Sequence, residues 1–141
     1  TIQSIDTEKS IATLQKNNIL VYSNITLDFP DSYEIIPQQN QNYILNRKDI
    51  NNINLAINKC DNNIIECLGS GVSMSKPSEN DFVKIYYGVS TDTDFSYGLY
   101  IKKTQELYTI NVNLPDDKVS AGFNNTIFHE IDQTLLKATI K

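Results

Sequence analysis

Three segments in the second half of the chain alternate apolar and polar residues with a period of two. They run over Phe82–Val89, Tyr97–Lys102 and Tyr108–Leu114. Because successive side chains of a strand point to opposite faces of the sheet, each segment presents apolar residues on one face and polar residues on the other. The pattern predicts an antiparallel β-meander, which the turn-forming Pro115-Asp116-Asp117 brings to an end.

Helical spacing is expected in three other places, at the N-terminus, in the middle and at the C-terminus of the chain. In the middle segment isoleucines recur at i, i+3 and i+7, the spacing of a buried helical stripe: Ile50, Ile53 and Ile57. Asp6 and Asp49 precede the first two segments as N-cap residues. The predicted helices run from Thr7 to about Lys16, from Asp49 onwards, and from Asn124 or Asn125 to about Ala138.

Two further strands complete the predicted fold, over Ile19–Leu27 and Tyr43–Asn46, with a turn at Asp28–Asp31 and a polar loop at Pro37–Asn42. An antiparallel sheet packed with N-terminal, middle and C-terminal helices is an α+β architecture. With 141 residues and 40% hydrophobic content, residues 1–141 are expected to form a single domain with its own core.

The charge pattern argues against a nucleic-acid partner. The chain has 12 Lys and Arg against 17 Asp and Glu, a net charge of −5, and its basic residues adjoin only at Arg47-Lys48 and Lys102-Lys103. Binding to phosphates requires a basic patch. Mild acidity suits either a basic protein partner or solubility alone. No apolar run approaches the roughly 18 residues that cross a membrane, so no transmembrane segment is predicted.

The two cysteines, Cys60 and Cys67, are separated by six residues. They form a structural disulfide, a redox couple or two free thiols, and this spacing lacks the two-residue gap of redox and zinc motifs. A catalytic thiol also needs a basic neighbour, and Lys59 stands beside two acidic residues. We expect a disulfide, hence an oxidising compartment. The start at Thr1 fits a removed signal peptide or a trimmed chain.

Motifs for catalysis or metal binding are incomplete. His129-Glu130-Ile131-Asp132-Gln133 has glutamine where a zinc-protease helix has its second histidine, so His129 is expected to be a surface residue. Asp92-Thr93-Asp94-Phe95-Ser96 begins like a calcium loop, but the sixth and twelfth positions are Tyr97 and Lys103 instead of glycine and glutamate. No catalytic residue, metal site or cofactor is predicted.

Contact residues for a protein partner are expected in the meander. The loop before its second strand carries two carboxylates and a phenylalanine, and several aromatics lie on the face opposite the core, either covered by a helix or loop or exposed as an interface patch. The predicted contact residues are Asp92, Asp94, Phe95, Tyr86 and Tyr100.

One segment resembles a known family. The stretch from Asn24 to Ile35 is similar to the opening strand and Pro-acidic turn of PsbP-like domains, and Tyr108–Val112, Pro115 and the final amphipathic helix look like that family's closing elements. The chain departs from it at Tyr33, where such domains carry tryptophan. The resemblance implies an α-β-α sandwich that acts as a non-catalytic binding or assembly module, and it assigns no active-site residue.

The leading hypothesis is a non-enzymatic, exported bacterial domain that binds protein, most specifically a periplasmic immunity or inhibitor protein that neutralises a basic toxin. A lipoprotein-type ligand-binding or assembly factor of the envelope is the first alternative. The second is a small hydrolase that uses carboxylates such as Asp116 and Asp117, which requires a buried pair in a cleft. Neither the partner nor the oligomeric state is specified by the sequence.

Overall fold

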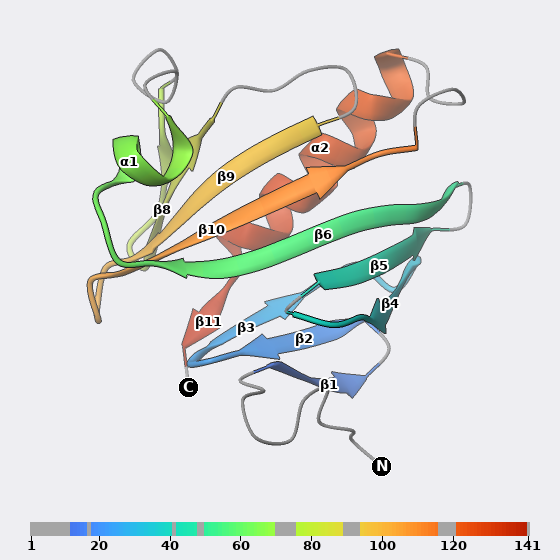
Figure 1. The fold of residues 1–141 in the computed structure, drawn as a ribbon, viewed down its shortest axis with the longest axis horizontal. Coiled ribbons are helices and arrows are strands. Elements are labelled where there is room, and N and C mark those ends of the chain that lie inside the picture. The colour runs from blue at the N-terminus through green and yellow to red at the C-terminus, as the bar shows by residue number, and fades with distance from the viewer. Residues whose placement is uncertain are drawn as a thin grey trace.

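A computed structural model describes residues 12–16, 18–40, 42–47, 50–69, 76–88, 94–115 and 121–140. Within these residues, antiparallel β-sheet is the main structure (Figure 1). The longer sheet has the strand order β4-β5-β6-β10-β9-β8-β7 and the shorter one the order β1-β2-β3-β11.

The strands of the longer sheet are β4 (Tyr33–Pro37), β5 (Asn42–Arg47), β6 (Ile50–Cys60), β7 (Ser78–Glu79), β8 (Val83–Tyr87), β9 (Asp94–Ile101) and β10 (Glu106–Asn113). Those of the shorter sheet are β1 (Ala12–Lys16), β2 (Ile19–Tyr22), β3 (Ile25–Asp28) and β11 (Thr139–Ile140). The two described helices are α1 (Ile64–Leu68) and α2 (Ala121–Leu136).

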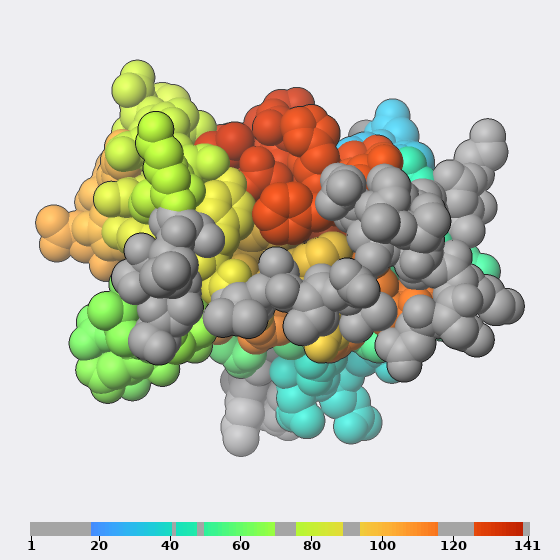
Figure 2. All heavy atoms as spheres, turned by 90° about the horizontal axis from the view of Figure 1, so that it is seen from above, coloured from blue at the N-terminus to red at the C-terminus, as the bar shows by residue number. Residues whose placement is uncertain are grey.

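The core lies between one face of the longer sheet, the shorter sheet and α2. Apolar residues at alternate positions of β6, β8, β9 and β10 are buried there, together with the α2 stripe of Ile127, Ile131 and Leu135. The rings of Tyr22 in β2 and Tyr108 in β10 meet edge to face at 5.8 Å. Figure 2, viewed at right angles to Figure 1, shows α1 in green and α2 in red on opposite sides of the longer sheet. We call the face that carries α1 the outer face.

The predicted meander and C-terminal helix are confirmed. Strands β8, β9 and β10 pair in sequence, with Val83 opposite Ile101 and Leu99 opposite Tyr108. Helix α2 covers the core as expected, although it begins at Ala121 and ends at Leu136.

The α+β fold with N-terminal and middle helices is wrong. Residues 12–16 form strand β1, and the predicted middle helix is strand β6. A bulge explains the misleading spacing. Ile53 lies opposite Leu45 and Ile50 opposite Arg47, so β6 has one extra residue between these pairs, and Asn52 has a φ of 66°. The bulge turns both isoleucines to the core despite their separation of three.

Smaller corrections concern the strands near the N-terminus. The single strand predicted over Ile19–Leu27 is a hairpin, β2 and β3, whose turn contains Ser23 at a φ of 56°. Strand β4 was not predicted. The turn predicted at Asp28–Asp31 lies later in the chain, where the Tyr33 N–H donates to Pro30 O, and Asp28 is the last residue of β3. The caps Asp6 and Asp49, and residues 7–11 of the predicted first helix, lie outside the described residues.

Candidate functional site

The feature that distinguishes the outer face is α1, which lies across β9 at Gly98. A Cβ atom at Gly98 would lie 3.0 Å from Leu68 Cδ1 and nearer still to Ile64 Cδ1. Gly98 pairs with Tyr86 on β8 and with Thr109 on β10, so its position is near the middle of the sheet. The missing side chain lets the helix approach the sheet backbone closely.

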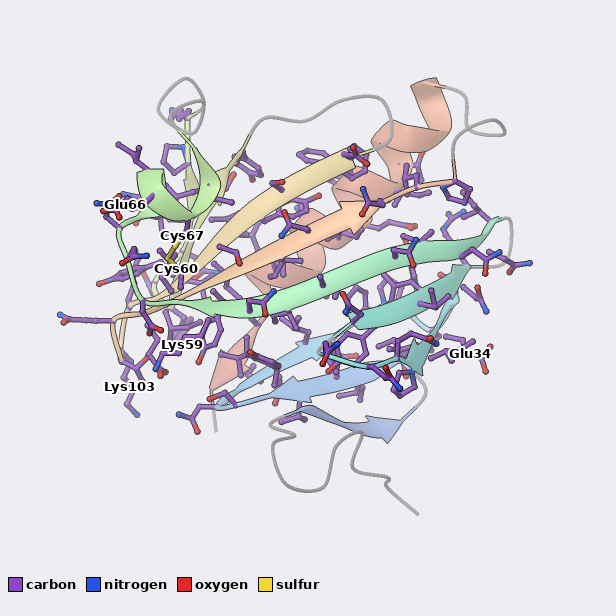
Figure 3. The ribbon with its side chains drawn as sticks, viewed as in Figure 1. Glu34, Lys59, Cys60, Glu66, Cys67 and Lys103 are labelled. Atoms are coloured by element: carbon purple, nitrogen blue, oxygen red, sulfur yellow. A yellow bond between two sulfur atoms is a disulfide. The ribbon has the colours of Figure 1, made fainter. Side chains whose placement is uncertain are left out.

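A disulfide links α1 to the sheet. Cys60, the last residue of β6, is bonded to Cys67 in α1, with their Cα atoms 6.3 Å apart. The predicted disulfide is therefore confirmed. Figure 3 shows the bond, with Lys59 and Glu66 nearby, at one end of the longer sheet.

The helix begins with a local cap. Asn63 Oδ1 accepts a hydrogen bond from the Glu66 backbone N–H at 2.9 Å, and Asn63 Nδ2 donates to Glu66 Oε1 at 2.7 Å. This pair resembles a capping box and satisfies a backbone donor of the first turn. The Asn63-Ile64-Ile65-Glu66 string inside the cysteine loop was the sequence signal for α1, and it was missed.

Beside α1 the outer face has a hollow of about 460 Å³. Tyr86 and Tyr100, both half-buried, line it from β8 and β9, and Leu107 lines it from β10. Ile64 and the turn after β6 complete the wall. Leu107 of β10 lies opposite Cys60 of β6 on one side and opposite Tyr100 of β9 on the other. Tyr100 in turn lies opposite Lys84 of β8, so the sheet register places these four residues in one row.

Exposed hydrophobic side chains lie on the elements that frame this hollow. Ile65 of α1 is 51% exposed, and Phe82, directly before β8, is 67% exposed. The Phe82 carbonyl accepts a hydrogen bond from Lys102 N. Phe82 therefore lies on the same face as Lys84, two residues before it, next to the pair of Lys84 and Tyr100. We define the α1 surface as Ile65, Phe82, Tyr86, Tyr100 and the hollow.

The charges around the hollow are partly paired. Lys59 Nζ lies 3.2 Å from Glu106 Oε2, and this hydrogen bond lowers the pKa of Glu106 and raises that of Lys59. The Lys84 ammonium lies 5.1 Å from the centre of the Tyr86 ring, a cation–π distance. Asp61 and Glu66 are exposed and give this end of the molecule acidic groups.

The structure brings together only part of the predicted contact set. Tyr86 and Tyr100 both line the hollow. Asp94 is exposed at the opposite end of β9 from Tyr100 and accepts a hydrogen bond from Asn113. Phe95 is 6% exposed and packs on Phe128 in the core, which leaves it out of the α1 surface. Asp92 lies outside the described residues.

A second hollow, of about 550 Å³, lies between β3 and α2. Its lining includes Asp28, Asp31 and the exposed His129, a combination that sequence reasoning did not foresee. Glu130 also lines it, but its carboxylate is engaged. Arg47 Nε donates to Glu130 Oε1 at 2.9 Å, and the Tyr33 hydroxyl donates to the same oxygen at 2.6 Å.

No metal site is found in the part of the chain that the structure describes, since no group of three or more His, Cys, Asp or Glu side chains converges there. Asp116 and Asp117, the carboxylates of the hydrolase hypothesis, lie outside the described residues. No helix among the described residues is long and apolar enough to span a membrane.

Comparisons with known proteins return no match: no family model, curated protein or solved structure is similar to this chain.

Proposed function

We propose that this chain is a non-catalytic, exported domain that binds a protein partner through the α1 surface. The observation that carries the proposal is the open hollow between the disulfide-linked helix and the half-buried Tyr86 and Tyr100. Tyrosine is enriched among the residues that dominate protein interfaces, because it buries a large ring and retains a hydroxyl for hydrogen bonding.

The surface is suited to a protein more than to a small ligand. The hollow is open and one of its walls is the polar turn after β6. Exposed Ile65 and Phe82 lie on α1 and directly before β8, the elements beside it. Interfaces commonly combine such an apolar centre with a polar rim. Exposed Asp61 and Glu66 at this end can pair with lysine or arginine of a partner, and Lys84 beside Tyr86 can pair with a carboxylate.

The specific partner that we propose is a basic toxin acting in the periplasm, which the chain would neutralise. Export is supported by the disulfide, since disulfides persist in oxidising compartments. The acidic net charge of −5 favours attraction to a basic protein.

Affinity capture tests this function. The oxidised chain, immobilised, is exposed to the periplasmic and secreted fractions of the source organism, and captured proteins are identified by mass spectrometry. We expect a basic protein whose toxic activity is inhibited by equimolar chain. Capture of envelope-assembly components instead would replace the toxin-inhibitor proposal with the assembly factor.

A further inference from the structure

Helix α1 has few non-covalent contacts to fix it on the sheet. It contains five residues, none of them buried. Helices this short have no stability of their own in water. The backbone-to-backbone hydrogen bonds described for this segment join its own residues, from Cys67 N to Asn63 O and from Gly69 N to Ile65 O. Its contact with β9 is made by Ile64 and Leu68 over Gly98. The disulfide is therefore the strongest single attachment of α1 to the sheet.

The rest of the fold does not depend on α1. The core cluster contains no residue of the segment 61–69. Cys60 itself belongs to β6, where it lies opposite Leu107, and the neighbouring Lys59 lies opposite Tyr108. If the link is cut, Cys60 keeps its place in the sheet while the segment after it loses its second attachment.

The two sulfurs differ in access and in what holds them after reduction. Cys60 is 8% exposed, whereas Cys67 is half-buried on the helix. Cys60 Sγ lies 3.2 Å from Asn62 O, so a thiol at this position has a carbonyl to which it can donate.

We propose that the Cys60–Cys67 disulfide is a redox-sensitive clamp of the α1 surface. A dithiol attacks Cys67 Sγ, the sulfur–sulfur bond breaks, and Cys60 leaves as a thiolate that takes up a proton. The second thiol of the reductant then attacks the mixed disulfide, releasing Cys67 as a thiol and leaving the reductant as its own disulfide. Helix α1 separates from Gly98, and the hollow beside Tyr86 and Tyr100 is lost. The binding consequence rests on the proposed function, whereas the release of α1 does not.

Hydrogen exchange tests the release of α1 without any partner. Peptides covering 61–69 and 107–113 are followed by mass spectrometry in the oxidised protein with and without dithiothreitol. Complete reduction is verified by alkylation of both thiols. We expect amides of 61–69 to exchange at least tenfold faster after reduction, while those of 107–113 in β10 are unchanged.

The matched control is the double variant Cys60→Ser/Cys67→Ser. It should show the fast exchange of 61–69 without reductant and no response to dithiothreitol. Unchanged protection of 61–69 in the fully reduced protein overturns the clamp, and so does simultaneous loss of protection in 107–113, which means that the whole domain unfolds.

A separate arm uses the protein captured by the oxidised chain. Binding should weaken at least tenfold after reduction, and equal affinity in the two redox states overturns the regulatory part of the proposal. Failure of the oxidised chain to capture any protein counts against the proposed function, whereas the exchange of 61–69 tests the clamp alone.

Discussion

Gly98 of β9 lies beneath Ile64 of α1, so close that a side chain at position 98 would meet the helix. The core face of β9 carries apolar side chains at alternate positions. On its outer face, Gly98 lies between Tyr86 and Thr109 of the neighbouring strands. The contact also shapes the hollow. Ile64 forms part of its wall, and the distance between α1 and the sheet determines where that wall lies.

Replacing Gly98 with leucine should lift α1 while the two sheets remain folded. Alanine is a weaker test, because the atoms it would meet are the ends of the flexible Ile64 and Leu68 side chains. We expect the amide NMR shifts of residues 63–69 to change and those of β6 to stay. Asn111→Leu, at an exposed position of β10 on the same face, is the control and should leave 63–69 unaffected. Unchanged α1 shifts in Gly98→Leu would show that the contact is not tight.

Removing the disulfide should lower global stability by a limited amount. Closing a loop of eight residues is worth about 2.5 kcal/mol in the chain-entropy description. Because α1 is also released in the folded variant, urea denaturation of Cys60→Ser/Cys67→Ser should show a free energy of unfolding lower by no more than about 2.5 kcal/mol. The variant should still fold, since domains of this size have about 5–15 kcal/mol. A variant that is unfolded in buffer would contradict the local role given to this bond.

The ion pair between Arg47 and Glu130 should contribute more than the exposed pair between Lys102 and Glu79. Arg47 and Glu130 side chains are 13% and 26% exposed, and the carboxylate also accepts from Tyr33. Glu130→Ala should cost about 2 kcal/mol, the scale of a hydrogen bond to a charged group. The control, Glu79→Ala, should change the melting temperature little, because exposed pairs add little. Equal effects in thermal denaturation would refute this ranking.

Alkaline pH should destabilise the domain through its core tyrosines. Burial raises the pKa of Tyr33, Tyr43 and Tyr97, and burial together with a hydrogen bond to Asp132 raises that of Tyr87 to about 12. An unfolded tyrosine ionises near pH 10. The folded state thus retains protons that the unfolded state loses, so stability is intact below about pH 10 and falls as pH rises toward 12.

Tyrosinate absorbance near 295 nm checks this, measured together with far-UV circular dichroism. Ionisation of the core tyrosines should coincide with loss of β-sheet signal. Full ionisation of all 8 tyrosines in a chain that retains its sheet would contradict the burial of these hydroxyls.

The sequence predicted those elements in which the pattern of apolar and polar residues is regular. The strands β8 to β10 and helix α2 have uninterrupted patterns, and the structure follows them. The predicted middle helix is wrong because the bulge at Asn52 gives a strand the i, i+3 spacing of a helix, although β-branched isoleucines favour a strand.

Only those residues of the candidate site were predicted whose face follows from the alternation within a single strand. Tyr86 and Tyr100 are placed on the outer face because each lies an odd number of residues from core-facing residues of its own strand. Phe95 was assigned to a loop, but β9 begins at Asp94, so the alternation turns Phe95 inward. The hollow needs the register between four strands and the close approach of α1 at Gly98, and neither is visible in a single sequence.

Site-specific photocrosslinking in the source organism tests the central claim most directly. Benzoylphenylalanine is placed in turn at position 65 on α1 and position 100 on β9, and, as controls on exposed outer-face positions away from the hollow, at positions 54 and 111. We predict a higher-mass adduct with one protein from positions 65 and 100 and none from the controls. Adducts confined to positions 54 and 111, or none from any position, would contradict a partner-binding role for the α1 surface.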